Sequence, residues 1–278
     1  MRQVAPWLSQ EELALFNELF SNRFGLFFPE HKREILESRL MPRLRANHLQ
    51  RFIDYYLLLQ YDFQREVDAL TQAITNNESY FFREIGQFES LQGQVLKNLI
   101  DEGTRPGNLR ILSAGCSSGE EPYTLNIFLR QQPAITASNL MIDGIDLDTE
   151  RLDQARSALY RPGSLRTLEK AQIDRFFIQH DESTYELRAP FRVGVKLSRG
   201  NILDPSTFPR PPYDALFCRN VLIYFSETAL KQAIENFAQA VRPGGLLFLG
   251  HSESIIGLTQ AFQAERLGNC IAYRRKAT

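Results

Sequence analysis

The chain has 278 residues, of which 43% are hydrophobic and 23% are charged, as in ordinary globular proteins. This length suffices for one large domain, or for a core domain with a smaller partner. The formal net charge of −1 excludes a uniformly basic nucleic-acid binder, although a local basic patch can still attract a polyanion.

Cysteines and histidines give no sign of a metal site or a disulfide framework. Cys116, Cys218 and Cys270 lie far apart with no CxxC pair, and the four histidines show no HxxxH spacing. No window is long and apolar enough for a membrane span, and the first residues lack the apolar run of a signal peptide. We therefore expect a cytoplasmic protein without a metal ion and without membrane insertion.

The first 80 or so residues predict an all-helical domain. Ser9 and Glu12 have capping-box spacing, and apolar residues then recur at helical intervals. A second helix is expected from about His31 into the forties. Pro42 lies within this second helix and is expected to kink or end it.

One face of the second helix is basic. Lys32, Arg39 and Arg43 fall within about 40° of one another at about 100° per residue, and Arg45 lies nearby. Two interpretations stay open: a solvated basic face, or a surface that recognises an acidic partner.

Beyond about residue 106 the pattern alternates between strands and helices. Strands are predicted over 109–114, 140–145, 193–198, 215–218 and 246–250, and helices over 149–158 and 227–241. This alternation is typical of a parallel, Rossmann-like α/β sheet. We expect a helical domain over 1–80, a linker helix region over 81–105 and an α/β domain over 106–278. Short β-like runs at about 180–198 indicate a small β subdomain.

The carboxyl ends of the strands are where an open α/β sheet binds its ligand. After the first strand, Gly115 and Gly119 allow close approach of backbone, and Glu120 and Glu121 open a helix. Two carboxylates can simply stabilise the helix dipole. They also disfavour a pyrophosphate and favour a ligand that carries a cationic amino group.

Later strand ends carry groups that suit a nucleoside. Asp146 is placed to accept hydrogen bonds from ribose hydroxyls, whereas Asp148 is expected to cap the next helix. Asn201 can pair with an adenine edge, and Ile202 can pack on the base. The fourth strand is followed by Cys218, Arg219, Asn220 and Tyr224. Together these ends describe S-adenosylmethionine and hence a methyltransferase.

Five segments carry a family resemblance. They read NNESYFFRE (76–84), AGCSSGEEPY, DGIDLD, FCRNVLIYF and RPGGLLFLGHSES. In this order and spacing the chain resembles the CheR-type chemotaxis receptor methyltransferases over nearly its whole length. The resemblance implies an all-α domain before a methyltransferase domain with a small β subdomain. It also implies transfer of a methyl group from S-adenosylmethionine to glutamate side chains of chemoreceptors, giving glutamate methyl esters and S-adenosylhomocysteine in bacterial chemotaxis adaptation.

The resemblance also implies roles for particular residues. Besides Gly115, the implied cofactor contacts are Asn77, Ser79, Arg83, Glu121, Asp146, Asn201, Ile202, Cys218 and Arg219. Arg83 and Tyr224 match positions that handle the substrate carboxylate, so we expect them to be catalytic. In relatives the basic second helix docks on the methylation region of the receptor. The segment HDESTYEL (180–187) is shorter than in relatives that hold a receptor tail, so we expect no dependence on a receptor C-terminal pentapeptide.

Two alternatives stay open. One is a methyltransferase of another substrate, such as a small carboxylate or RNA. The other is a non-catalytic module that binds S-adenosylmethionine or S-adenosylhomocysteine as a signal. The PPYD segment at 211–214 precedes the fourth strand, whereas amino methyltransferases of nucleic acid carry a similar motif after it. We therefore expect no nucleic-acid partner, and nothing in the sequence demands more than a monomer.

Overall fold

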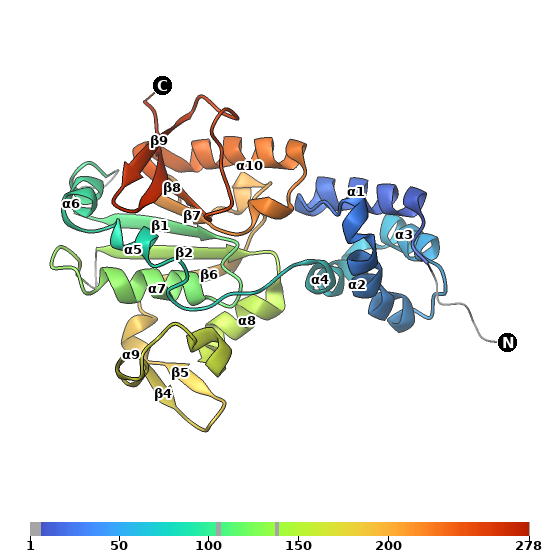
Figure 1. Cartoon of the computed structure of the whole chain (residues 1–278), viewed down its shortest axis with the longest axis horizontal. Helices are drawn as coiled ribbons and strands as arrows, with labels where there is room; N and C mark the ends of the chain where they lie inside the picture. The colour runs from blue at the N-terminus through green and yellow to red at the C-terminus, as the bar shows by residue number, and fades with distance from the viewer. Residues whose placement is uncertain (1–6, 104–106, 137–138, 278) are drawn as a thin grey trace. The chain divides into compact units, whose positions relative to one another are not determined.

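The computed structural model describes residues 7–103, 107–136 and 139–277, which form two compact units (Figure 1). The first unit comprises the described part of Met1–Asn76 together with Tyr224–Leu230. The second comprises the described part of Asn77–Ile223 and of Lys231–Thr278. No helix in these described ranges is long and apolar enough to cross a membrane.

The first unit is helical, as predicted. Its elements are α1 (Gln10–Phe24), the 3₁₀ turn η1 (Glu30–Lys32), α2 (Arg33–Ala46), α3 (Phe52–Tyr61) and α4 (Phe63–Ile74). The capping box is confirmed, because Glu12 N donates to Ser9 Oγ at 3.1 Å and Ser9 N donates to Glu12 Oε2 at 2.8 Å. Buried aromatic rings fill the interior, with Phe16 and Phe20 centroids 5.5 Å apart.

Helix α2 does not end at Pro42 but runs on to Ala46. Proline removes one backbone hydrogen bond, the one to the carbonyl of Ser38 four residues earlier. Ser38 and Pro42 are both exposed, so water can satisfy that carbonyl. Leu44 is buried and anchors the last turn in the interior. Of the two expectations for Pro42, a kink or a helix end, the helix end is therefore wrong.

The segment Tyr224–Leu230 is tied to the loop that follows α1. Phe27 N donates to the Tyr224 carbonyl at 2.8 Å, and Ser226 N donates to the Gly25 carbonyl at 2.9 Å. A Cβ at Gly25, whose φ is 82°, would lie 2.7 Å from the Phe225 ring. Only glycine fits this left-handed position. The segment that begins at Tyr224 is thus part of the helical unit.

The second unit is built on a seven-stranded sheet with the order β6-β2-β1-β7-β8-β10-β9. The strands are β1 (Leu109–Ala114), β2 (Leu140–Asp146), β6 (Val195–Arg199), β7 (Tyr213–Cys218), β8 (Val241–Leu249), β9 (Phe262–Leu267) and β10 (Cys270–Arg275). The first five strands of the order pair in parallel, while β10 is antiparallel to both β8 and β9. The predicted α/β fold class is confirmed, whereas β9 and β10 were not predicted.

Helices cover both faces of this sheet. The helices of this unit are α5 (Gly86–Glu89), α6 (Gly93–Asp101), α7 (Glu120–Leu129), α8 (Thr149–Ser157), α9 (Lys170–Phe176) and α10 (Glu227–Ala240). Helix α9 lies beside the small sheet described below and does not cover the large one. In Figure 1, α7 and α8 lie below the sheet, and the part of α10 from Lys231 onward lies above it. The rings of Phe217 and Phe248 stack with their centroids 4.4 Å apart, and both belong to the hydrophobic core of this unit.

A second, antiparallel sheet is formed by β3 (Leu159–Tyr160), β5 (Tyr185–Leu187) and β4 (Phe177–Gln179), in that spatial order. Strand β6 follows it in the chain but pairs with β2 of the large sheet. The Phe81 ring packs edge-on against Tyr160 at 4.8 Å and Phe177 at 5.0 Å. The small sheet therefore anchors the segment that leads into Arg83. The 3₁₀ turns of this part of the chain are η2 (Pro162–Leu165), η3 (Ala189–Phe191), η4 (Pro205–Thr207) and η5 (Leu222–Tyr224).

Candidate cofactor site

The strand order reverses between β1 and β7, which is where an open α/β sheet forms its ligand crevice. Gly115 follows β1 with a φ of 79°. A Cβ at this position would lie 2.6 Å from Val221 Cγ2, in the loop that follows β7. The two loops therefore touch, and only a residue without a side chain fits between them.

A buried arginine lies at this switch point. Arg219 is 7% exposed, and its Nη2 donates to the Arg83 carbonyl at 2.5 Å and to Glu84 Oε2 at 3.1 Å. Its Nη1 donates to Glu121 Oε2 at 3.2 Å. Two carboxylates share one guanidinium, so the cluster carries a net negative charge that suits a cationic ligand.

Glu121 and its neighbour Glu120 have different roles. Glu121 accepts a further hydrogen bond from Ser113 Oγ at 2.7 Å, and burial raises its pKa despite the nearby Arg219. Glu120 is almost fully buried and accepts from Ser118 Oγ at 2.9 Å and Ser164 Oγ at 3.0 Å. Glu120 is thus a structural link to η2, while Glu121 faces the switch point.

Arg83 lies between two residues with unusual backbone. Phe82 and Glu84 have φ values of 54° and 55°, in the left-handed region that bulky residues rarely adopt. Such strain persists only where the surroundings impose it. Phe82 is buried, and the Arg83 guanidinium donates to the Glu78 carbonyl at 3.2 Å and lies 5.5 Å from the Tyr80 ring. The fold therefore presents Arg83 from a fixed turn.

Asp146 ends β2 beside the loop that contains Gly115. Its carboxylate accepts from Ser117 N at 2.7 Å and from Asp148 N at 2.9 Å, while burial raises its pKa to about 6. Asp148 caps α8, as predicted, by accepting from the backbone of the first turn. Asn77 reaches the same edge, because its Nδ2 donates to Asp148 Oδ2 at 2.8 Å and its carbonyl accepts from Ser117 Oγ at 3.2 Å.

The other predicted cofactor residues are partly or fully buried. Asn201 Oδ1 accepts from Leu203 N at 3.0 Å, which fixes the turn after β6. Ile202 and Cys218 are both buried, and burial keeps the pKa of the Cys218 thiol well above its ordinary value. Cys218 is therefore a packed thiol and not a nucleophile. Ser79 is partly buried, two residues beyond Asn77.

The basic residues of η1 and α2 differ in what they contact within the helical unit. Arg43 Nη2 binds the buried Glu66 at 2.8 Å, and Arg39 Nη1 donates to the Ile74 carbonyl at 2.6 Å. Lys32 Nζ lies 5.7 Å from the centre of the Tyr224 ring, and Asn76 Nδ2 donates to Tyr224 Oη at 2.5 Å. Arg45 is exposed and forms no ion pair with any described residue. Three of the four predicted recognition residues therefore contact other residues of the helical unit, and Arg45 is the exception.

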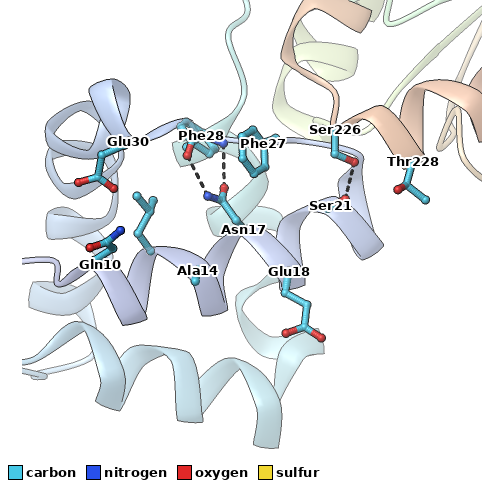
Figure 2. A pocket seen from close by; sticks show the side chains of 11 residues that line it. Gln10, Ala14, Asn17, Glu18, Ser21, Phe27, Phe28, Glu30, Ser226 and Thr228 are labelled. Carbon is cyan, nitrogen blue, oxygen red and sulfur yellow. Dashed lines mark hydrogen bonds between the residues drawn. The ribbon is translucent and has the colours of Figure 1, made fainter.

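The helical unit also contains a hollow of about 450 Å³ beside α1 (Figure 2). It is lined by Gln10, Leu13, Ala14, Asn17, Glu18, Ser21, Phe27, Phe28, Glu30, Ser226 and Thr228. Asn17 exchanges two 2.8 Å hydrogen bonds with the Phe28 backbone, and Ser21 and Ser226 hydroxyls lie 2.6 Å apart. These polar groups have partners, and none of the predicted site residues lines the hollow.

Two protein-family models match the chain. A model described as "CheR methyltransferase, SAM binding domain" matches residues 77–270, and one described as "CheR methyltransferase, all-alpha domain" matches residues 11–75. The chain belongs to the CheR methyltransferase family. As a CheR methyltransferase it uses S-adenosylmethionine as its cofactor.

Several curated relatives cover most of this CheR methyltransferase. "Chemotaxis protein methyltransferase 2" of Vibrio cholerae is 33% identical over 96% of the chain and 93% of the relative. "Chemotaxis protein methyltransferase" of Salmonella typhimurium is 34% identical over 92% of the chain and 88% of the relative. "Probable biofilm formation methyltransferase WspC" of Pseudomonas putida is 32% identical over 94% of the chain and 61% of the relative.

The residues of the switch point fit S-adenosylmethionine. This molecule carries a sulfonium cation and an amino group, and the excess carboxylate beside Arg219 offsets positive charge. Asp146 presents a carboxylate at the β2 end, where ribose hydroxyls bind in such sheets. Among the described residues no group of three or more His, Cys, Asp or Glu side chains could hold a metal ion.

The sequence analysis did not single out two acidic residues of this site, Glu84 and Glu253. Glu84 pairs with Arg219, and Glu253 accepts backbone hydrogen bonds from the loop that follows β7. Both residues lie inside segments quoted for the family resemblance, NNESYFFRE and GHSES. Their partners are far away in the chain, so no local pattern indicates the contacts.

Proposed function

We propose that this methyltransferase modifies glutamate side chains in the cytoplasmic methylation region of chemoreceptors, in chemotaxis adaptation. The names of the V. cholerae and S. typhimurium relatives support a role in chemotaxis. The observation that carries the proposal is the buried Arg219 cluster, because it links the proposed cofactor contact Glu121 directly to the backbone of Arg83. The cofactor residues and the proposed substrate arginine are thus held by one set of contacts.

We propose the same cofactor contacts as those expected from the sequence. Glu121 would bind the amino group at the amino-acid end, Asp146 the ribose hydroxyls, and Asn201 with Ile202 the adenine. The remaining contacts that we propose are Asn77, Ser79, Arg83, Gly115, Cys218 and Arg219. Gly115 supports this assignment, since its missing side chain lets the β1 loop pack against Val221, two residues after the proposed cofactor contact Arg219. S-adenosylmethionine supplies an electrophilic methyl group on its sulfonium sulfur.

The chemistry requires little from the protein beyond alignment. A glutamate carboxylate is ionised at neutral pH and is already a nucleophile, so no general base is needed. Arg83 would orient the two carboxylate oxygens through paired N–H donors. Tyr224 would donate its hydroxyl proton to a substrate oxygen. The carboxylate oxygen would take the methyl group as its bond to sulfur breaks, leaving S-adenosylhomocysteine, and the chain's part would be to hold the carboxylate in line.

The proposed receptor-binding surface is the basic face with Lys32, Arg39, Arg43 and Arg45. Arg45 supports it best, since its charge is exposed and has no internal partner in the described chain. Arg39 and Arg43 hold α2 against α4, so they would set the shape of this surface. An acidic partner would meet the outward charges of Lys32 and Arg45.

We also propose that the protein acts in the cytoplasm as a monomer, without a nucleic-acid partner and without dependence on a receptor C-terminal pentapeptide. The short turn between β4 and β5 supports the last point. Calorimetric titration with a receptor-tail peptide tests it. A measurable heat of saturable binding would contradict it.

The decisive experiment is transfer of radioactive methyl from S-adenosylmethionine to receptor-containing membranes. Mild alkali then releases volatile methanol from glutamate methyl esters. Label that is alkali-labile, and absent from an Arg83→Ala variant that still binds S-adenosylhomocysteine, would establish carboxyl methylation of a receptor.

Receptors outside chemotaxis are a second substrate candidate, because the P. putida relative is named for biofilm formation. The same assay with membranes from a strain that lacks chemotaxis receptors separates the two. A small carboxylate or RNA as substrate predicts transfer without any membranes. Tight cofactor binding without transfer to any acceptor would favour a non-catalytic signalling module.

A further inference from the structure

Glu253 lies in the turn after β8 and accepts five backbone hydrogen bonds. Its Oε2 accepts from Gly250 N at 2.6 Å and Asn220 N at 2.9 Å. Its Oε1 accepts from Val221 N at 2.9 Å, Leu222 N at 2.7 Å and Ile223 N at 3.3 Å. One carboxylate thus satisfies four consecutive N–H groups of the loop after β7 and one of its own turn.

Four consecutive backbone N–H groups that point at one place form a nest for negative charge. Asn220, the first of the four, has a φ of 59°, in the left-handed region that asparagine tolerates better than most residues other than glycine. Hydrogen bonds to an ionised acceptor are about twice as strong as neutral ones. The Glu253 carboxylate therefore stabilises a loop shape that the loop would not hold by itself.

This loop connects the proposed cofactor contacts. Arg219 precedes the first bonded residue, Val221 packs against the Gly115 turn, and Tyr224 follows Ile223 in the chain. A shift of the loop would move the Arg219 guanidinium away from Glu121 and Glu84. The carboxylate of Glu253 is the contact that fixes the loop from the side of β8.

We propose that Glu253 is a positioning residue for methyl transfer. Its carboxylate holds residues 220–223 against the glycine turn after β1, and so fixes Arg219. This inference rests on the proposed placement of S-adenosylmethionine at the switch point. Glu253 touches neither cofactor nor substrate in this proposal, and it acts only through the loop.

Glutamine in place of Glu253 is the sharpest probe, because it keeps the shape of the side chain. One of its two ends is an NH₂ group, which would face N–H donors where a carboxylate oxygen now accepts. Glu253→Ala removes both oxygens and leaves room for acetate, which matches the lost CH₂COO⁻ group. Glu235→Gln, on the exposed side of α10, is the matched control.

Three readouts are compared in the full-length protein. They are S-adenosylhomocysteine affinity by calorimetry, methyl transfer to receptor membranes, and hydrogen exchange of the 220–223 amides. For Glu253→Gln and Glu253→Ala we expect turnover to fall about 100-fold, the cost of a misplaced group in a reacting site. We also expect weaker product binding and faster exchange of the four amides. Acetate restores all three in the alanine variant, whereas acetamide at the same concentration does not.

Wild-type affinity, turnover and amide protection in both variants would overturn the inference. Losses without faster exchange at 220–223, or losses that acetate leaves unchanged in a folded alanine variant, would overturn it as well. If the alanine variant does not fold, the glutamine variant decides by the same readouts without acetate. If the wild type binds S-adenosylhomocysteine but methylates no receptor, the proposed substrate is wrong. The S-adenosylhomocysteine affinity and the amide exchange of the variants then still test the role of Glu253.

Discussion

Each unit of the chain holds an arginine against glutamate, but the two clusters differ in charge balance. In the sheet unit, Arg219 binds Glu121 and Glu84, which leaves one negative charge in excess. In the helical unit, Arg43 binds Glu66, whose carboxylate also accepts from the Tyr55 hydroxyl at 2.9 Å. The first cluster can receive a cation, whereas the second is complete as it stands.

The pKa values of the two glutamates, Glu121 and Glu66, shift in opposite directions. Burial raises the pKa of Glu121 despite the lowering effect of Arg219. Burial acts on Glu66 in the same direction, but hydrogen bonds from Asn47, Arg43 and Tyr55 outweigh it and lower its pKa. A carboxylate whose ionisation the fold opposes is ready for a positive ligand, and such groups concentrate at functional sites. A carboxylate whose ionisation the fold favours stabilises the fold itself.

Replacing Arg219 gives the largest expected effect. Arg219→Met leaves Glu121 and Glu84 without a counter-charge in a buried place, which costs about 3–5 kcal/mol of unfolding free energy. S-adenosylhomocysteine affinity falls with it. Urea unfolding and calorimetry measure the two quantities. Arg219→Lys, which keeps the charge without the forked donors, is the matched control and should lose less. Unchanged stability in the methionine variant would show that the cluster is not a coupled unit.

Replacing Arg43 tests the other half of the comparison. Arg43→Met leaves the Glu66 carboxylate with fewer donors, and we expect a loss of about 1–3 kcal/mol in unfolding free energy. S-adenosylhomocysteine affinity should stay at the wild-type value, because the pair lies in the helical unit. Urea unfolding and calorimetry check both points. A variant of full stability with weakened receptor methylation would instead make Arg43 a direct receptor contact.

The sequence predicted the strand ends well because parallel strands bring their carboxyl ends to one edge, whatever lies between them in the chain. The first strand has its predicted bounds at 109–114, and Asp148 caps α8 as expected. The carboxyl ends of the strands could therefore be located from the sequence, and the cofactor contacts assigned to them stay a prediction.

Partners far apart in the chain could not be predicted in this way. Arg219 and Glu84 are 135 residues apart, and Arg43 and Glu66 are 23 residues apart. Helical spacing predicted a basic face with Lys32, Arg39 and Arg43, but Lys32 lies in η1, before α2 begins. The spacing also does not say which of these residues have an internal partner. Pro42 was misjudged for a related reason, since the burial of Leu44 outweighs one lost hydrogen bond.

Ionisation of Asp146, at the end of β2, is expected to have a smaller, pH-dependent effect on stability and on S-adenosylhomocysteine affinity. Burial raises its pKa from 3.8 to about 6, so ionisation opposes folding. Its contribution to stability is present below pH 4 or so and is lost as pH rises through about 6. Ribose hydroxyls need the ionised form as acceptor, so S-adenosylhomocysteine affinity should rise with pH over the same window, by at most about tenfold per unit.

Calorimetry between pH 5 and pH 8 measures this slope against an Asp146→Asn variant. The variant has no carboxyl to ionise and should bind more weakly with a flatter profile. Glu121, whose pKa is also raised by burial, contributes in the same direction and accounts for any slope that remains. Equal slopes in the two proteins would remove Asp146 from the cofactor site.

Replacing Arg45 gives the smallest expected effect. It tests the role of the basic surface without a large change in stability. The Arg45 side chain is exposed and has no ion pair among the described residues, so Arg45→Ala should change unfolding free energy by no more than about 0.5 kcal/mol. If the α2 face meets an acidic receptor, the variant methylates receptor membranes more slowly at low salt. The difference from wild type shrinks as salt rises, because the Debye length falls to about 8 Å at physiological ionic strength. Lys32→Ala should show the same dependence on salt, but it also removes the contact of Lys32 Nζ with the Tyr224 ring. A rate independent of both residues at every salt concentration would leave the basic face as ordinary solvated surface, and receptor recognition would then have to come from another part of the chain.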